Sequence, residues 1–238
     1  MRHKALFLIV FGLLVLCGIL QVNRLISYGY KNLAAVQLAS MNQDKRSNVD
    51  LLDHAAVLGE KALALLPMDT SIRRLLGQIY LQSHQLRKAS SVLGVNEAGC
   101  PDVVTCYLQG ETLRAYGDDE GAITLWRTIP NIDQYFAFQG DIAFEKGDKS
   151  EALRLYNLSW RITDTPTPKK TTMFLNLCRE HRNAREMATA IYWCEQAVRS
   201  RNDYWTTVEL GRTYFEAKQY RSAESTLRGA ILLAPERG

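Results

Sequence analysis

The stretch LGRTYFEAKQYRSAESTLRGAILLAP, Leu210 to Pro235, combines good helix formers with small residues at set intervals. Gly211 and Ala223 stand twelve residues apart, and the larger Tyr214 and Leu227 follow them closely. Two antiparallel helices approach closely only where side chains are small, so Gly211 and Ala223 predict a helical crossing. We expect the larger side chains to fill the flanking space, and the final proline to stop the second helix.

The same spacing recurs upstream with a period of about 34 residues. The corresponding glycine and alanine pairs are Gly77 and Ala89, Gly110 and Ala122, and Gly140 and Ala152. A weaker copy has Cys178 and Ala190, while Ala55 and Pro67 stand one period ahead of Ala89 and Pro101. Such periodicity predicts a repeat architecture, in which each hairpin buries its apolar face against the next one.

As a set, these residues resemble the tetratricopeptide repeat family, whose unit is a helix-turn-helix with L-G-x-x-Y, a later alanine and a terminal proline. The resemblance covers about residues 50–237. It implies an all-α solenoid of helical hairpins wound into a right-handed superhelix, with about five full repeats and a half repeat. Ala143 and His181 replace the tyrosine, and the leading helix of the first unit, within residues 33–50, barely matches.

The N-terminus carries a separate signal, because MRHK precedes the apolar run ALFLIVFGLLVLCGILQV at residues 5–22. As a helix this run spans about 27 Å, close to the roughly 30 Å of a bilayer core. No small-x-small cleavage site follows, which favours an uncleaved anchor over a removed signal peptide. We therefore expect a transmembrane anchor in residues 1–26, a juxtamembrane segment and degenerate first helix in 27–49, and the solenoid in 50–238.

The charge distribution bears on partners and on location. The formal charge is +4, but three of the 29 basic residues, Arg2, Lys4 and Arg24, flank the apolar run. Without these three, 26 basic and 25 acidic residues remain, so the body of the protein is nearly neutral. The body lacks the basic footprint of a nucleic-acid-binding protein, so no nucleic acid is expected as a partner. A short charged tail before an apolar run behaves as a signal anchor, which places the solenoid outside the cytoplasm.

Cysteine usage leaves two alternatives open. Cys100, Cys106, Cys178 and Cys194 form an even set, which fits two disulfides outside the cell or four buried thiols inside it. The repeat register places Cys178 and Cys194 on the two helices of one unit near their crossing, so they are the predicted disulfide in an oxidising compartment. Cys100 and Cys106 are spaced to close a short loop.

No catalytic constellation is present in the sequence. The histidines are not paired at metal-ligand spacing, the cysteines lack a C-x-x-C motif, and neither a glycine-rich phosphate loop nor a nucleophile elbow occurs. We expect a noncatalytic protein without catalytic residues, metal or cofactor.

Repeat arrays of this kind bind ligands on an extended concave surface. The resemblance implies a groove lined by the first helix of each hairpin. In this register its residues are Arg74, Gln78, Tyr107, Arg114, Phe144, Arg179, Arg182, Arg212 and Phe215, with Trp205 nearby. Arginine and aromatic residues are enriched at binding hot spots, which favours a protein or peptide ligand of acidic character. The alternative is a solvated, mixed helix face.

These observations predict a membrane-tethered scaffold or accessory subunit that holds a protein partner, with residues 5–22 contacting lipid and other transmembrane helices. One alternative is a transient peptide or client receptor of chaperone type. Another is a noncatalytic component of an envelope-biogenesis enzyme complex. The stretch TDTPTPKK, residues 163–170, is interpreted either as a tolerated insertion between repeats or as a docking loop.

Overall fold

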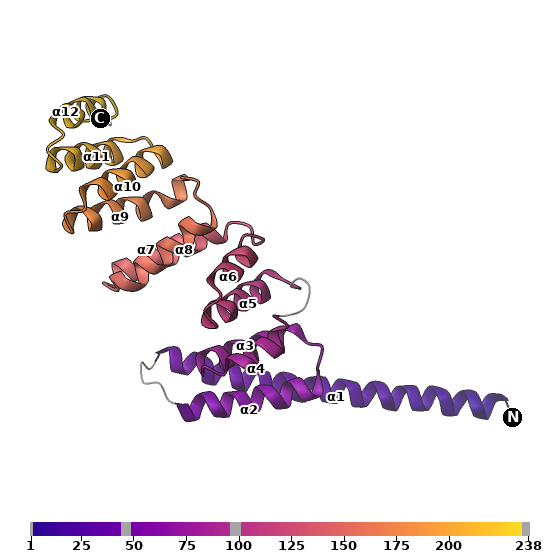
Figure 1. The fold of residues 1–238 in the computed structure, drawn as a ribbon. Coiled ribbons are helices and arrows are strands. Elements are labelled where there is room, and N and C mark those ends of the chain that lie inside the picture. The colour runs from indigo at the N-terminus through magenta and orange to yellow at the C-terminus, as the bar shows by residue number, and fades with distance from the viewer. Residues whose placement is uncertain (1, 44–48, 96–100, 235–238) are drawn as a thin grey trace. The chain divides into compact units, whose positions relative to one another are not determined.

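The structure is a computed structural model that describes residues 2–43, 49–95 and 101–234, with side chains described for residues 20–40 and from residue 50 onward within those ranges. Throughout these ranges the regular structure is helical, without strands (Figure 1). The helices are α1 (Arg2–Gln43), α2 (Val49–Leu65), α3 (Thr70–Gln82), α4 (Leu86–Leu93), α5 (Val103–Ala115), α6 (Asp119–Trp126), α7 (Ile132–Glu145), α8 (Lys149–Ile162), the 3-10 helix η1 (Pro168–Lys170), α9 (Thr171–Asn183), α10 (Met187–Ser200), α11 (Tyr204–Glu216) and α12 (Tyr220–Leu232).

The chain divides into two compact units, residues 1–126 with α1–α6 and residues 127–238 with α7–α12. Consecutive helices pair as hairpins, which are α1–α2, α3–α4 and α5–α6 in the first unit and α7–α8, α9–α10 and α11–α12 in the second. Within the second unit, α9 contacts both α7 and α11, so the hairpins stack in chain order. The predicted all-α repeat of helical hairpins is therefore confirmed.

A glycine on the first helix marks the crossing in four hairpins, and it is covered by a large side chain sixteen residues later. A Cβ atom on Gly110 would lie 2.1 Å from Trp126 Nε1, and one on Gly211 would lie 2.6 Å from Leu227 Cδ2. Gly77 with Leu93 and Gly140 with Tyr156 repeat this arrangement. The sequence suggested that Leu227 would only flank the crossing, but it lies directly on Gly211, because only a residue without a side chain leaves room for it.

The turn inside each of these four hairpins, and inside α9–α10, places one residue in the left-handed conformation, seven positions after the glycine or, in α9–α10, after Cys178. Gly117 and Gly147 adopt φ values of 88° and 82°, as expected for glycine at such a turn. In the other hairpins the same place is taken by His84, Arg185 and Lys218, at φ values of 57°, 65° and 60°. The backbone turn is thus common to the repeats, although glycine is not.

Proline does not stop the second helix everywhere that the sequence suggested. Helix α4 ends at Leu93 with Gly94 as a left-handed C-cap at φ 68°, well before Pro101. A glycine cap satisfies the last carbonyl groups, so no proline is needed there. Helix α2 does end just before Pro67, and Pro235 lies outside the described residues.

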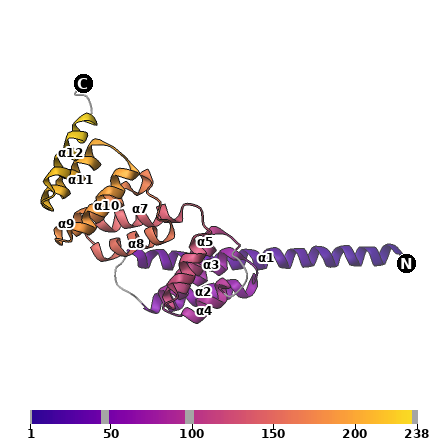
Figure 2. The same cartoon turned by 45° about the horizontal axis from the view of Figure 1, so that its top comes forward.

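Helix α1 is continuous from the apolar run into the first hairpin. From Ser27 onward it contacts α2, since Ser27 Oγ donates a hydrogen bond to the Ala62 carbonyl oxygen at 2.9 Å, and Ala34 and Leu38 are buried. The degenerate first helix that the sequence placed in residues 27–49 corresponds to the C-terminal half of α1. In both views the N-terminal part of α1 extends past α2–α4 (Figures 1 and 2).

Among the described residues, no helix combines the length and the apolarity needed to cross a membrane. The side chains of residues 5–19, most of the predicted anchor, lie outside that part of the structure. The anchor in residues 1–26 therefore stays a prediction.

Candidate protein-binding surface

The hairpin α9–α10 is closed by a disulfide between Cys178 and Cys194, whose Cα atoms lie 5.2 Å apart. Both cysteines are fully buried, and the hydroxyl oxygen of Thr213 on α11 lies 3.4 Å from each sulfur atom. Cys106 is also a disulfide cysteine, while Cys100, which the sequence paired with it, lies outside the described residues.

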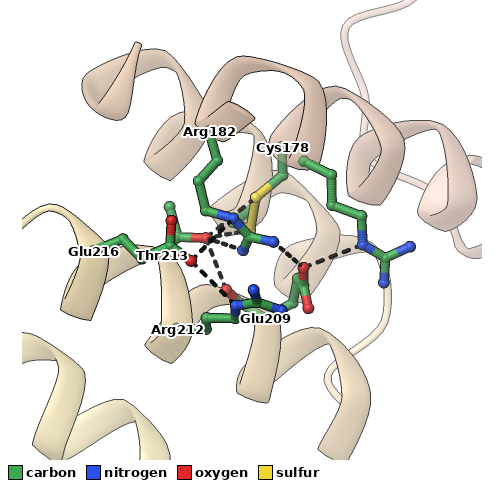
Figure 3. The surroundings of a disulfide bond; sticks show 8 residues. Cys178, Arg182, Glu209, Arg212, Thr213 and Glu216 are labelled. Atoms are coloured by element: carbon green, nitrogen blue, oxygen red, sulfur yellow. Dashed lines mark hydrogen bonds and ion pairs between the residues drawn. A yellow bond between two sulfur atoms is a disulfide. The ribbon is translucent and has the colours of Figure 1, made fainter. Parts of the chain in front are cut away.

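A charged network joins α9 to α11 beside this disulfide (Figure 3). Arg182 is 5% exposed, and its guanidinium donates to Glu209 Oε1 at 2.8 Å and to Thr213 Oγ1 at 3.1 Å. Arg179 donates to the same Glu209 oxygen at 3.1 Å. On the other side, Glu216 lies 3.5 Å from Arg182 Nε and accepts a hydrogen bond from Arg212. The network fixes how hairpin α11–α12 stacks on α9–α10.

The pKa of Glu209 reflects two opposing effects. Burial raises the pKa of this carboxyl, but hydrogen bonds and charge from Arg182 and Arg179 lower it by more, so the net shift is downward. The carboxylate is therefore held ionised where the two helices meet. Arg182, placed in the groove by the family pattern, is engaged in this interior contact and presents no guanidinium at the surface.

One exposed side of α11 carries the most exposed of the predicted residues. Trp205 is 68% exposed and Phe215 is 60% exposed. Their spacing, with Arg212 between them, places all three on one side of the helix. Tyr204 packs edge-on against Trp205, and Tyr220 packs in the same way against Phe215, with ring centroids 5.0 Å and 5.6 Å apart. We refer to Trp205, Arg212 and Phe215 on α11, together with Tyr220 at the start of α12, as the α11 face.

The predicted arginines outside this face are all bound within the chain. In the first unit Arg74 donates to Asp102 at 3.0 Å, and Arg114 pairs with Glu111 at 2.9 Å. Each of the five predicted arginines is therefore paired with a carboxylate of this chain: Arg74 with Asp102, Arg114 with Glu111, Arg179 and Arg182 with Glu209, and Arg212 with Glu216. An acidic ligand would have to displace these carboxylates.

The remaining predicted residues are partly covered. Tyr107 stacks on Trp126 with ring centroids 6.4 Å apart, and Gln78 is half-buried on α3. Phe144 lies under the ammonium group of Lys149, 6.0 Å from its ring centre. The structure thus gathers Trp205, Arg212 and Phe215 on one exposed face and joins Arg179 and Arg182 to Arg212 through Glu209 and Glu216. Arg74, Gln78, Tyr107, Arg114 and Phe144 do not belong to this face.

The loop at residues 163–170 is held against the rest of the second unit by a buried lysine. Lys170 is fully buried, and its ammonium group lies 2.7 Å from Asp133 Oδ2 and donates to the Thr163 carbonyl oxygen at 2.7 Å. Nothing in the repeat pattern singles out this lysine. Its buried ion pair with α7 fixes the end of the loop and the start of α9.

A second feature that the sequence missed is an open pocket of about 270 Å³ in the second unit. It is lined by α8, α9 and α10, with Trp160, His181 and Trp193 among its residues. Trp160 packs edge-on against Trp193 and against Phe174. None of the predicted groove residues is among those lining the pocket.

Comparison with known proteins yields likenesses among solved structures alone. No family model and no curated protein matches the chain. Similar solved structures include PilF of Pseudomonas aeruginosa (14% identity, 90% of this chain and 79% of that chain, TM-score 0.36). A thermophilic TPR protein of Thermus thermophilus is 18% identical, with 89% of this chain and 93% of that chain covered and a TM-score of 0.32. The TPR2AB domain of yeast Sti1, in a pHSP90 complex, is 15% identical, with 86% of this chain and 89% of that chain covered and a TM-score of 0.36. TM-scores this low do not support an argument about this chain. Its description as a tetratricopeptide-like run of helical hairpins rests on its own sequence repeat and on its own fold.

Proposed function

We propose that this chain is a membrane-tethered, noncatalytic scaffold that binds a protein partner through the α11 face. The observation that carries the proposal is the exposure of Trp205 and Phe215 on one side of a helix, with Arg212 between them. Large aromatic side chains are costly to leave in water, and together with arginine they are the residues that dominate protein interfaces. Hairpin stacking holds this face on a rigid support.

The partner segment that fits this face is apolar or aromatic, with a carboxylate at its edge. Arg212 is exposed and pairs with Glu216 at 3.1 Å across one helical turn. Exposed pairs of this kind contribute little, about 0.3–0.5 kcal/mol. A carboxylate of the partner therefore replaces Glu216 at small cost, whereas Arg182 and Glu209 stay locked in the interior.

Membrane attachment and an extracytoplasmic location belong to the same proposal. The apolar run of residues 5–22 continues as one helix into the hairpin that begins to pack at Ser27. Leu20, Val22, Leu25 and Ile26 are exposed just before that point. The buried disulfide between Cys178 and Cys194 supports an oxidising compartment, where such bonds persist.

The test of the binding face is a comparison of full-length variants purified from gently solubilised membranes. Trp205→Ala/Phe215→Ala should lose the co-purifying partner, while Tyr116→Ala, which removes a half-exposed aromatic from the first unit, should retain it. Equal recovery of partner by both variants would remove the α11 face from the proposal. A partner that exchanges within minutes would instead favour the transient receptor.

The location is tested separately by labelling. Ser225 is exposed on α12, so a Ser225→Cys variant provides a reactive thiol on the second unit. Labelling by a membrane-impermeant maleimide in intact cells is the expected result. Labelling only after the cells are broken would place the hairpins in the cytoplasm.

A further inference from the structure

Helix α1 is apolar on two opposite sides between residues 20 and 40. One side packs on the first unit, where Ser27, Ala34 and Leu38 are buried and Lys31 donates to Ser71 Oγ at 2.8 Å. The other side faces away from α2, and four of its apolar residues remain exposed: Val22 by 54%, Ile26 by 45%, Leu33 by 56% and Val36 by 65%. We refer to these four and Gly29 as the α1 stripe.

The spacing of the α1 stripe is that of a coiled-coil seam. Residues 22, 26, 29, 33 and 36 are separated by steps of four and three, the heptad pattern that keeps one line of side chains facing a partner helix. In the sequence the same steps continue N-terminally through Ile19, Val15, Gly12 and Leu8. Because residues 5–20 are apolar or glycine at every position, that part of α1 offers an apolar surface in any register, and the seam itself is defined by the two heptads of residues 22–36.

We propose that the α1 stripe pairs with the α1 stripe of a second copy of this chain, in parallel. The positions beside the seam carry no charge: Asn23, Leu25, Tyr30, Asn32 and Gln37. The only charged residues of α1 between residues 20 and 43 are Arg24 and Lys31, which lie off the stripe. Two identical helices thus meet without like-charge repulsion, which otherwise opposes self-pairing.

The parallel arrangement rests on the membrane anchor of the proposed function, because two copies inserted in one membrane enter it through residues 5–22 from the same side. In a parallel two-fold pair, Ile26 meets Ile26 and Leu33 meets Leu33, so the apolar seam is in register along its whole length. Gly29 stands in the middle, and nothing lies within 4 Å of the place where its Cβ would be. At that level the two backbones can approach closely, as they do at small residues in paired helices.

This pairing is independent of the partner proposed for the α11 face, and the two can fail separately. The proposed pairing uses α1 in the first unit, whereas the partner is bound by α11 in the second. Loss of the partner in Trp205→Ala/Phe215→Ala would leave self-association unchanged. Loss of self-association in an α1 variant would leave the α11 face intact.

The first test is disulfide cross-linking of the full chain in native membranes, in a Cys17→Ser background. Val22→Cys lies on the stripe, and Arg24→Cys, two residues later and also exposed, lies on the other side of the helix. A parallel pair brings only the first close to its copy, so its dimer should form at least about 10-fold faster, because a disulfide needs Cα atoms within roughly 7 Å. Equal rates for both variants would overturn the proposal.

The second test is the mass of the full chain in mild detergent, by sedimentation. The unmodified chain should sediment as a dimer of the 27.0 kDa chain. Leu33→Glu should be monomeric, because it places two like charges in the seam, while Gln21→Glu, also at an exposed site but off the stripe, should remain dimeric. Retained helicity by circular dichroism shows that Leu33→Glu is folded. A monomeric unmodified chain, or a dimer with a different protein through α1, would contradict self-pairing.

Discussion

Cys178 and Cys194 form a disulfide across hairpin α9–α10 with a sequence separation of 16. The same separation joins Gly211 to Leu227, the large side chain that covers it, and joins the corresponding glycines of three other hairpins to their covering residues. The disulfide therefore stands where the other hairpins place a large side chain on a glycine. It links the two helices covalently at the point where they approach most closely.

If the disulfide is equivalent to the glycine contact, stability should depend on which of Cys178 and Cys194 is replaced by glycine and which by leucine. Cys178→Gly/Cys194→Leu restores the arrangement of α11–α12, whereas Cys178→Leu/Cys194→Gly has the same composition in the wrong order. The second variant should be less stable by roughly 1–3 kcal/mol, because a large side chain is forced into the crossing. Urea unfolding of the two proteins measures the difference. Equal midpoints would show that the disulfide is not equivalent to the glycine contact.

The glycine crossing itself is tested with two alanine substitutions in one hairpin. Gly211→Ala places a methyl group 2.6 Å from Leu227, while nothing lies within 4 Å of the same group at Gly229. We expect Gly211→Ala to destabilise the protein by about 1–3 kcal/mol. Gly229→Ala should gain up to about 1 kcal/mol through helix propensity. Thermal unfolding checks both signs, and a stabilised Gly211→Ala would refute this crossing.

The buried ion pair of Lys170 predicts a sharp contrast between neighbouring lysines. Lys170→Met leaves Asp133 buried without its cation and should cost roughly 3–5 kcal/mol. Lys169 is exposed, so Lys169→Met should change stability by no more than about 0.5 kcal/mol. Chemical unfolding of the two variants gives the comparison. Similar small effects would mean that the pair does not hold the 163–170 loop.

Asp141 and Asp203 have pKa shifts of opposite sign, so we expect them to affect the pH dependence of stability in opposite ways. Burial raises the pKa of Asp141 above its ordinary 3.8; the hydrogen bond from Tyr156 opposes this shift and the charge of Glu145 adds to it. Because its folded-state pKa is raised, ionised Asp141 costs stability at neutral pH, and the cost disappears as pH falls below about 3.8. Asp141→Asn should therefore raise Tm at pH 7 and have little effect at pH 3.

Asp203 provides the control of opposite sign. Burial raises the pKa of this N-cap residue, but hydrogen bonds from Thr206 and Arg201 outweigh it, so its pKa is lowered. Its ionised form therefore contributes stability above about pH 3.8, and the contribution is lost as pH falls. Asp203→Asn should lower Tm at pH 7. Shifts of the same sign in both variants would contradict the assigned environments.

The hairpin fold could be predicted from the sequence because small residues recur with a period that few other architectures share. The register located Gly77, Gly110, Gly140 and Gly211, and it placed Cys178 and Cys194 on paired helices. The sequence did not show that Leu227 lies on Gly211 itself, since that depends on the exact offset of two helices. Nor did it show that α4 ends at Leu93 with Gly94 as its C-cap.

The binding surface was harder to predict, because exposure depends on contacts between hairpins. Arg182 and Arg179 look alike in the family pattern, yet Arg182 is buried by α11 while Arg179 stays exposed. Pairs within one helix, such as Arg212 and Glu216, are visible in the spacing alone. The contact of Arg182 with Glu209, 27 residues away, becomes visible only after the hairpins are stacked.

The most direct test of the central claim is the native mass and composition of the full chain isolated from gently solubilised membranes. The proposed scaffold predicts a second kind of protein at a fixed ratio that survives dilution and is lost from Trp205→Ala/Phe215→Ala. Recovery of this chain alone, as one copy or as multiples of 27.0 kDa, would contradict a scaffold that holds a constant partner.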